Sequence, residues 1–549
     1  MKIKLLFSII CISVFSNGFS QWVQSPAINT PVCVQPHRQD DARIVSDSKS
    51  GAIITWTDYR VDSIHGDIYV QRMNAAGYPM WTANGVGVCT DTNHQSMEYM
   101  CQSENGAAII VWEDNRNADR DIYAQKVDSL GNILWTANGV AVCSKIAKQK
   151  NPRVMSDGVG GAFVVWEDSV GGTFDIYAQR VSSTGVNLWT AGGIPICNAA
   201  GIQGGARIAT DGFGGAIIAW QDKRGFIDNF IYAQRVDASG NVKWTANGAI
   251  ICNTPGGQIN PKLIADGNHG AYLAWQDKRN GDDYDIYAQR IDSTGTIKWG
   301  QFGNIVCSAI FNQSAIDMTA DHTDGTIIAW KDERNSIYQI FANRVRGDGS
   351  KPWVNNGILL GTGINPNTDD DASGGAVIAW QDSTSTNGTW DVFSQRIDST
   401  GAKLWLATGD SVSIADGGQT GPKNISTGDG GSIYTWVDKR SGDHDIYAHR
   451  MVGHHSYAGI YEYKDNAYSI SCYPNPFNTQ TTILINSEKT IKSWKLNIYD
   501  ASGKMVMTQE MSNTNKALIN KGNLSEGYYF YQAISNTEVL GRGNFVITQ

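Results

Sequence analysis

A unit of 50 to 56 residues recurs along most of the chain, and this repeat constrains the fold more than any other feature. Each unit contains an apolar strand ending in Trp-x-Asp, a strand of the Asp-Ile-Tyr-Ala-Gln-Arg type, and a glycine turn before a strand with a second tryptophan. The first-series tryptophans are Trp56, Trp112, Trp166, Trp220, Trp275, Trp330, Trp380 and Trp436. A period of this length predicts supersecondary units that bury their apolar faces against their neighbours.

One unit is divided between the two ends of the array. The second tryptophan series has seven members within the units: Trp81, Trp135, Trp189, Trp244, Trp299, Trp353 and Trp405. Trp22, followed by Cys33, supplies the eighth before any complete unit has begun. A closed ring needs such a clasp to hide its free strand edges, whereas a linear solenoid does not. We therefore predict an all-β fold, an eight-bladed β-propeller over residues 21–452 that is closed by its N-terminal strand.

Composition agrees with many short strands, because the chain has 59 glycines in 549 residues and only 18% charged residues. The net charge of −9 argues against nucleic acid as a partner. Lys2 and Lys4 precede an apolar run from Leu5 to Phe15, which predicts a secretory signal peptide over residues 1–20. No later apolar run reaches the ~18 residues of a membrane span, so we expect no transmembrane segment.

The repeat ends at Arg450, and a predicted linker over 453–466 leads into a different sequence at 467–549. Its motifs include Tyr473-Pro-Asn-Pro-Phe-Asn478, Leu524-Ser-Glu-Gly-Tyr-Tyr-Phe-Tyr531 and Gly541-Arg-Gly-Asn-Phe-Val-Ile547. Alternating strands broken by such turns predict a small β-sandwich. In motif order the segment resembles the type A sorting domain of the type IX secretion system. The resemblance implies a Bacteroidetes bacterium, the type IX secretion machinery as a partner, and a protein either secreted or anchored to the outer-membrane surface.

The outer segment Asp292-Ser-Thr-Gly295-Thr-Ile-Lys-Trp299 resembles the tryptophan-docking motif of eight-bladed quinoprotein dehydrogenases. The resemblance implies eight blades with a tryptophan docked between neighbours. The vicinal cysteine pair of that family is absent from this chain. Six cysteines instead share one repeat position, which predicts small buried core residues.

Every unit has an aspartate two residues after its first tryptophan, and six units place an arginine two residues later. Six units also begin the next strand with a second aspartate. We predict a structural arginine held between two carboxylates across a hairpin. Two hairpins keep both carboxylates without the arginine, and they are the candidate Ca²⁺ sites: Asp168 with Asp175, and Asp382 with Asp391. No other cofactor is predicted.

Seven glutamines occur at one position, where each outer strand crosses to the next inner strand. A ring of amides there could bind a glycan or peptide, or tie blades together by bonding to the backbone. Both interpretations stay open at this point. The residues are Gln39, Gln95, Gln149, Gln203, Gln258, Gln313 and Gln419.

Aromatic residues interrupt the repeat in the hairpins after the Trp-x-Asp strand. Stacking on sugars or peptides and local packing are both consistent with their position. These candidate ligand-binding residues are Phe174, Phe226, Tyr284, Tyr338 and Trp390. Five cations also share one inner-strand position, and their repetition predicts pairing between neighbouring blades. They are Arg43, Arg153, Arg207, Lys262 and Lys423.

Sequence motifs of nucleophilic hydrolases, zinc proteases and nucleotide-binding loops are absent from the chain, and no catalytic residue is assigned. The leading hypothesis is a non-catalytic module that binds a glycan, a peptide or a surface protein. The alternative is a secreted propeller enzyme, either a glycan-acting hydrolase or a quinoprotein-like oxidoreductase. An enzyme should break the repeat with a convergent acid, base or cofactor site.

Overall fold

The computed structural model describes residues 22–23, 25–117, 119–224, 227–383, 389–453, 469–486, 491–500, 504–522, 524–535 and 539–548. The chain divides into two compact units, Met1–His454 and His455–Gln549. The predicted signal peptide and nearly all of the predicted linker lie outside the described residues. Within the described part, no helix is long and apolar enough to cross a membrane.

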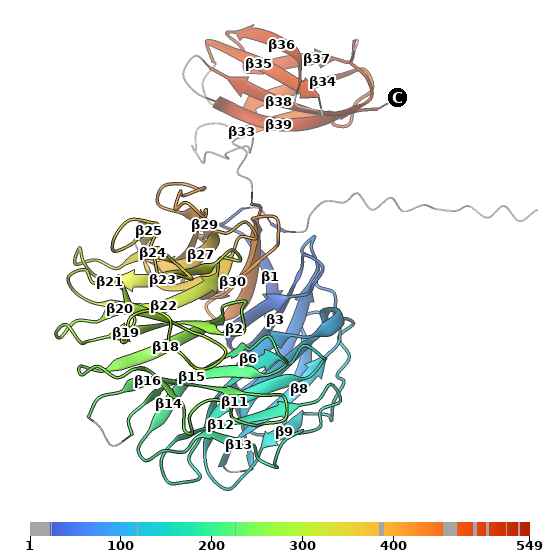
Figure 1. Ribbon diagram of the computed structural model, residues 1–549. Coiled ribbons are helices and arrows are strands. Elements are labelled where there is room, and N and C mark those ends of the chain that lie inside the picture. Colours follow the sequence, from blue (N-terminus) through green and yellow to red (C-terminus); the bar gives the residue numbers. More distant parts are fainter. Residues whose placement is uncertain are drawn as a thin grey trace, which may run out of the picture. The chain divides into compact units, whose positions relative to one another are not determined.

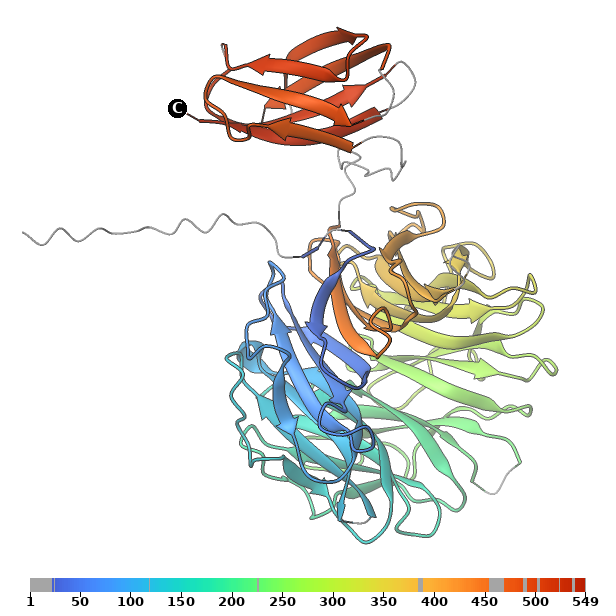
Figure 2. The same cartoon turned by 180° about the vertical axis from the view of Figure 1, so that it is seen from behind.

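The described residues of the first unit form eight four-stranded antiparallel sheets, which follow one another around the unit (Figures 1 and 2). We number the sheets 1 to 8 in the order of their first strands. The first strands are β2 (Gln39–Ser46), β6 (Gln95–Gln102), β10 (Gln149–Ser156), β14 (Gln203–Thr210), β18 (Gln258–Ala265), β22 (Gln313–Ala320), β26 (Ile364–Asp370) and β30 (Gln419–Ser426). The second strands are β3 (Ala52–Asp58), β7 (Ala108–Asn117), β11 (Ala162–Asp168), β15 (Ala216–Asp222), β19 (Ala271–Asp277), β23 (Gly325–Asp332), β27 (Ala376–Asp382) and β31 (Ser432–Asp438).

The third and fourth strands complete each sheet, and a single 3-10 turn, Glu104–Gly106, is described in sheet 2. The third strands are β4 (Asp67–Met73), β8 (Asp119–Val127), β12 (Asp175–Val181), β16 (Phe230–Val236), β20 (Asp285–Ile291), β24 (Gln339–Arg346), β28 (Asp391–Ile397) and β32 (Asp445–Met451). The fourth strands are β5 (Val86–Cys89), β9 (Val140–Cys143), β13 (Ile194–Cys197), β17 (Ala249–Cys252), β21 (Asn304–Cys307), β25 (Ile358–Thr362), β29 (Asp410–Ser413) and, in sheet 8, β1 (Thr30–Cys33).

The second strands are the most deeply buried, because apolar residues cover both of their faces. All eight first-series tryptophans are 0% exposed. In sheets 1 to 6 and in sheet 8 the indole N–H donates to the aspartate two residues later, as with Trp220 and Asp222 at 2.8 Å. The six repeated cysteines are buried free thiols next to these aspartates. The fold is therefore all-β and propeller-like, with a core between sheets.

The second-series tryptophans join neighbouring sheets. Trp189 of sheet 3 donates its indole N–H to the Ala238 carbonyl of sheet 4 at 3.1 Å, and Arg180 of sheet 3 donates to the same oxygen at 3.2 Å. Arg180 also pairs with Asp157 of its own sheet at 2.8 Å. In five other pairs of neighbouring sheets, the equivalent tryptophan and arginine also donate to a single backbone carbonyl of the next sheet. These carbonyls belong to Ala75, Ser129, Ser293, Gly347 and Ser399. We call this arrangement the inter-sheet joint.

A glycine in each receiving turn lets the indole ring approach the backbone. A Cβ at Gly185 would lie 2.8 Å from Cγ of Trp135, and the φ angle of +85° disfavours any other residue. This turn, Ser182-Ser-Thr-Gly185, accepts the Trp135 indole N–H at the Ser183 carbonyl, at 3.0 Å. Contact and backbone conformation therefore both require its glycine.

The second unit contains two sheets, in the orders β33-β34-β37 and β36-β35-β38-β39. Its strands are β33 (Ser469–Tyr473), β34 (Gln480–Asn486), β35 (Ser493–Asp500), β36 (Met505–Ser512), β37 (Lys516–Asn520), β38 (Gly527–Ile534) and β39 (Val539–Ile547). Trp494, Leu496, Phe477 and Phe545 belong to one buried cluster. This arrangement agrees with the small β-sandwich expected for this segment.

The joint predicts unequal effects of two glycine substitutions. Gly185→Ala should lower the free energy of unfolding by about 1 to 2 kcal/mol through backbone strain, and by about 1 to 3 kcal/mol more through the clash with Trp135. Gly172→Ala is the matched control, because its φ is +90° but no atom lies within 4 Å of the added Cβ. Equal losses in chemical denaturation would show that the indole contact contributes nothing.

Candidate functional site

Every first strand has a register shift in its pairing with the second strand, and the residue after this shift occupies an equivalent position in all eight sheets. In β10 the register shifts between Lys150 and Arg153, and Asn151 has a φ of 54°. Beyond the bulge, Arg153 lies opposite Val165 of the second strand. The eight residues at this position, which we call the inner ring, are Arg43, Tyr99, Arg153, Arg207, Lys262, Asp317, Asn367 and Lys423.

The inner ring borders a cavity of about 270 Å³, which we call the central cavity. Five adjacent first strands, β6, β10, β14, β18 and β22, line it. They contribute Tyr99, Arg153, Arg207, Lys262 and Asp317. A single register position therefore brings charges from distant parts of the chain into one space.

The sequence interpretation of the five cations as inter-blade pairs is correct for Lys262 and also for Arg43 and Arg153, which both contact sheet 2. The described hydrogen bonds of the other two, Arg207 and Lys423, stay within their own sheets. Lys262 pairs with Asp317 of the next sheet at 2.9 Å, and Asn367 donates to the other Asp317 oxygen at 2.9 Å. The remaining four cations form no ion pair with a carboxylate of the described residues. Their recorded hydrogen bonds are to backbone carbonyls, for example from Arg207 to Ala206 at 2.8 Å. The repeat copies the cation without copying an acidic partner.

Burial makes these unpaired charges costly. Burial and the neighbouring Arg207 lower the pKa of Arg153 to about 10, and burial together with Arg43 lowers the pKa of Lys423 to about 8. A lowered pKa of a cation means that the folded protein disfavours the charged form. An anion placed among these groups would relieve that penalty.

Tyr99 is the aromatic member of the inner ring. The guanidinium carbons of Arg153 and Arg43 lie 3.7 and 4.6 Å from its ring centroid. Burial would raise the pKa of Tyr99, but Arg43 and Arg153 together lower it. The Tyr99 ring therefore contacts guanidinium groups from two neighbouring sheets.

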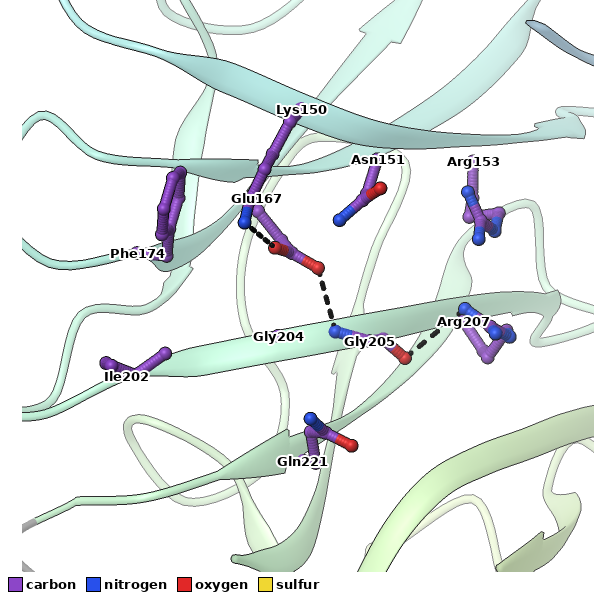
Figure 3. A pocket seen from close by; sticks show the side chains of 10 residues that line it. All are labelled: Lys150, Asn151, Arg153, Glu167, Phe174, Ile202, Gly204, Gly205, Arg207 and Gln221. Atoms are coloured by element: carbon purple, nitrogen blue, oxygen red, sulfur yellow. Dashed lines mark hydrogen bonds and ion pairs between the residues drawn. The ribbon is translucent and has the colours of Figure 1, made fainter. Parts of the chain in front are cut away.

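A second cavity, which we call the hairpin cavity, has a volume of about 340 Å³ and shares Arg153 and Arg207 with the central cavity. Figure 3 shows these two arginines on one side and Phe174 with Ile202 on the other. Glu167 accepts the backbone N–H of Gly205 at 2.8 Å and pairs with Lys150 at 3.4 Å. The amides of Asn151 and Gln221 complete a mixed polar and aromatic lining.

A third cavity of about 360 Å³, the outer cavity, shares Lys150 and Phe174 with the hairpin cavity. Its other lining residues are Asn115, Asp119, Arg120 and Lys148. Arg120 pairs with Glu113 at 3.0 Å. The three cavities thus form a series, each sharing residues with the next, which we call the basic tract.

Four of the five predicted aromatic candidates occupy one repeat position on separate sheets, and the fifth is Phe226. Phe174 lines two of the cavities, and Lys150 covers one of its faces at 3.7 Å from the ring centroid. Lys278 and Lys331 lie over Tyr284 and Tyr338 at 4.5 and 4.4 Å. Trp390 is half-buried, and Phe226 lies outside the described residues. Among the described residues, only Phe174 is brought together with the inner ring.

The seven glutamines are 0% exposed, and most of their amide N–H groups are directed into their own loops. Gln258 donates to the Thr254 carbonyl at 2.8 Å, and Gln313 donates to Phe311 at 2.7 Å. Gln203 is the exception, because neither of its amide atoms has a partner among the described residues. Backbone bonding, one of the two interpretations left open, accounts for the other six.

The hairpin arginine contacts only one of its two predicted carboxylates. Arg60 forms two hydrogen bonds with Asp58, at 2.9 and 2.6 Å, and lies 3.8 Å from the Tyr69 ring centroid. The second aspartate can instead accept a hydrogen bond from a different residue of the hairpin, as Asp121 does from Asn117 at 2.7 Å. The prediction of an arginine between two carboxylates is therefore wrong in its second half.

In sheet 3, which lacks the hairpin arginine, Lys145 lies over the tyrosine that the arginine covers in other sheets. Lys145 Nζ lies 5.1 Å from the Tyr177 ring centroid. In sheet 4 the equivalent contact is made by the hairpin arginine, because the guanidinium carbon of Arg224 lies 3.8 Å from the Tyr232 ring centroid. Burial, and then Asp168, raise the pKa of Asp175 to about 6. No group of three or more metal-binding side chains occurs in the described residues. In sheet 7, Asp382 accepts the Thr362 hydroxyl at 2.5 Å, and Asp391 begins β28.

Three inner acidic groups were not singled out by the sequence. Glu98 is fully buried, which raises its pKa to about 8, and it accepts the Thr57 hydroxyl at 2.7 Å. Burial raises the pKa of Asp369 to about 6, whereas Lys262 keeps the pKa of Asp317 low despite burial. The sequence does contain a signal for them, because each is an acidic residue at a first-strand position where most other units have an apolar or a basic residue.

Comparisons with known proteins identify the C-terminal segment. Residues 471–547 match the family described as secretion system C-terminal sorting domain. The match supports export by the type IX secretion system, implies interaction with its machinery, and indicates a secreted or cell-surface protein. A search of curated proteins found no match.

Solved structures similar to this chain include a polysaccharide lyase of family PL25, an ulvan lyase, with a TM-score of 0.38, 9% identity, and 70% and 97% of the two chains covered. An α-L-arabinanase of Penicillium chrysogenum has a TM-score of 0.34 and 9% identity over 58% and 97% of the chains. A protein of unknown function from Dyadobacter fermentans has a TM-score of 0.36 and 9% identity over 67% and 97%. At these values, the similarities carry no argument about a site.

The raised pKa of Asp175 predicts a pH-dependent effect of Asp175→Asn. The folded-state pKa of about 6 exceeds the usual ~3.9, so ionisation destabilises the folded state as the pH rises between these values. The variant should therefore melt at a higher temperature than the parent near pH 7, and the difference should vanish below about pH 4. Lower stability of the variant near pH 7 would contradict the assignment.

Asp237→Asn is the control of opposite sign. Despite slight burial, hydrogen bonds from Asn241 lower the pKa of Asp237, so its ionised form stabilises the fold and the variant should melt at a lower temperature near pH 7.

The same melting curves test the calcium pair. Stabilisation of the parent, but not of Asp175→Asn, by millimolar Ca²⁺ would establish metal binding there.

Proposed function

We propose that the first unit is an eight-bladed β-propeller closed by its N-terminal strand. The pairing of Thr30 with Ala448 and of Pro31 with Tyr447 supports this closure. The joint recurs between sheets 8 and 1, because Trp22 and Arg450 both donate to the Ala75 carbonyl, at 3.0 and 2.8 Å. First strands β30 and β2 also contact each other, as do those of successive sheets along the chain.

Deletion of residues 21–34 tests this closure. The deletion removes Trp22, β1 and the side chain of Asn29, which donates to the Val412 carbonyl of sheet 7 at 2.9 Å. Loss of one buried tryptophan alone should cost about 3 to 5 kcal/mol, and the bare edge of β32 should promote aggregation. An unchanged melting temperature and a monomeric elution volume would contradict closure by this strand.

We infer that this propeller is a secreted or surface-anchored binding module, for a glycan, a peptide or a surface protein, in a Bacteroidetes-type bacterium. The observation that carries the proposal is the basic tract, whose hairpin cavity is lined by side chains of β10, β11, β14 and β15 and by Phe174 of the hairpin before β12. Phe174 offers an aromatic edge, Asn151 and Gln221 offer amides, and Arg153 with Arg207 offers charge. Such a mixture of apolar surface and a few convergent polar groups is characteristic of ligand sites.

A glycan-acting hydrolase is the second candidate. Asp317 and Asp369 influence each other electrostatically, and their surroundings shift their pKa values in opposite directions. Paired carboxylates with separated pKa values can act as base and acid. Both oxygens of Asp317 already accept hydrogen bonds from Lys262 and Asn367, which favours the binding module. The quinoprotein-like alternative has no comparable support.

A glycan, peptide and surface-protein array probed with the full chain tests the proposal. We expect at least one ligand class to bind, and Phe174→Ala to weaken that binding by about 1 to 3 kcal/mol, by analogy with aromatic stacking. Tyr284→Ala is the matched control, since Tyr284 has the same repeat position and a similar lysine contact. Equal losses for both variants would exclude the hairpin cavity, and shortening of a bound glycan during incubation would favour the enzyme.

A further inference from the structure

We propose that the basic tract binds an acidic polysaccharide, whose carboxylate or sulfate groups are held by Arg153, Arg207 and the other unpaired cations of the inner ring. This inference rests on the proposed binding function and specifies its ligand. The argument begins with charge, because the whole chain has a net charge of −9. Five of the eight inner-ring positions are nevertheless cationic, and only one is a carboxylate. A cluster of positive charge in a protein of negative net charge therefore needs an explanation, either a structural partner for the cations or a bound anion.

Structural pairing does not supply that cause. The other repeated arginines of the unit have acidic partners, such as Arg235 with Asp211 at 2.8 Å and Arg334 with Asp332 at 2.6 Å. Arg153 and Arg207 lie close enough to lower the pKa of Arg153 and share two cavities. A guanidinium group binds a carboxylate or sulfate with paired, charge-assisted hydrogen bonds. Two half-buried guanidinium groups without a carboxylate partner are suited to such a group from a ligand.

The cations of the basic tract are distributed over all three cavities. Its cations follow the three cavities from Arg120, Lys148 and Lys150 through Arg153 and Arg207 to Lys262. Because successive cavities share residues, one linear ligand could occupy all of them. A free inorganic anion would occupy only one point of the tract.

The groups between the cations favour a polysaccharide over an acidic peptide. Glu167 and Asp119 line the tract beside the lysines. They would repel a run of peptide carboxylates but can accept hydrogen bonds from sugar hydroxyls. The amides of Asn151 and Gln221 can do the same, and Phe174 provides apolar surface for a sugar ring. Alternating cations and acceptors match a chain that alternates acidic groups with hydroxyls.

The test measures binding of the full chain to polygalacturonate, alginate, hyaluronan and chondroitin sulfate. The acidic group is then removed from the best binder, by methyl esterification or desulfation, without changing the sugar backbone. We expect at least tenfold weaker binding of the neutralised polymer, and weaker binding of the acidic polymer as sodium chloride screens the charges. Arg153→Gln and Arg207→Gln should each weaken binding about tenfold or more. Arg346→Gln, at an exposed position at the end of β24, should not.

Thermal unfolding without ligand separates a binding role from a structural one. Removal of an unpaired buried charge should leave the melting temperature of Arg153→Gln unchanged or raise it, and the second variant, Arg207→Gln, repeats the test. A lower melting temperature with unchanged affinity in both variants would overturn the inference. Equal binding of acidic and neutralised polymers would overturn it while keeping the proposed function. Preference for poly-aspartate would replace the polysaccharide by a peptide, and absence of any ligand on the array would overturn both proposals.

Discussion

The inter-sheet joint is the interaction on which the rest of the first unit depends. Trp189 and Arg180 illustrate it, because both donate to the Ala238 carbonyl of the following sheet. The tryptophan supplies apolar contact, the arginine supplies a charge-assisted bond, and the glycine of the receiving turn removes the Cβ that would block them. Because each joint uses a backbone carbonyl of its neighbour, the same contact can form between sheets whose side chains differ.

Repetition of the joint has a chemical consequence at the inner strands. The joint brings equivalent residues of successive sheets close together. A cation at one repeat position therefore lies near the cations of neighbouring sheets, and the like charges repel each other. Lys262 is neutralised by Asp317, whereas Arg153 and Arg207 have no carboxylate partner among the described residues and donate hydrogen bonds to backbone carbonyls. Stability alone would favour replacing such charges by neutral residues. Their presence is the physical basis for placing the ligand at the inner ring.

The sequence predicted those features that depend on local pattern. The period, the Trp-x-Asp strand and the split unit anticipated four-stranded sheets and the pairing of β1 with β32. The sorting domain was recognisable because its motifs occur in a fixed order and its strands alternate cleanly. The second carboxylate of the hairpin was misassigned, because sequence spacing does not say which side of Asp58 the Arg60 side chain takes.

The candidate site was harder to predict than the fold. The glutamines recur as regularly as ligand residues would, yet six of them donate to carbonyls of their own loops, which only coordinates reveal. The sequence showed that the five cations share one repeat position. It did not show whether carboxylates of neighbouring strands lie close to them, because that depends on the register shift at Asn151 and Gly205. Phe174 could be named from sequence, whereas its neighbours Glu167 and Lys150 could not, because they come from different strands.

A crystal structure of the protein grown with an oligosaccharide of its best acidic ligand would test the account most directly. The account predicts an acidic group within hydrogen-bonding distance of Arg153 and Arg207, with sugar rings extending past Phe174 toward Lys148. An oligosaccharide bound instead at the outer strands, with both arginines still directed at backbone carbonyls, would contradict it.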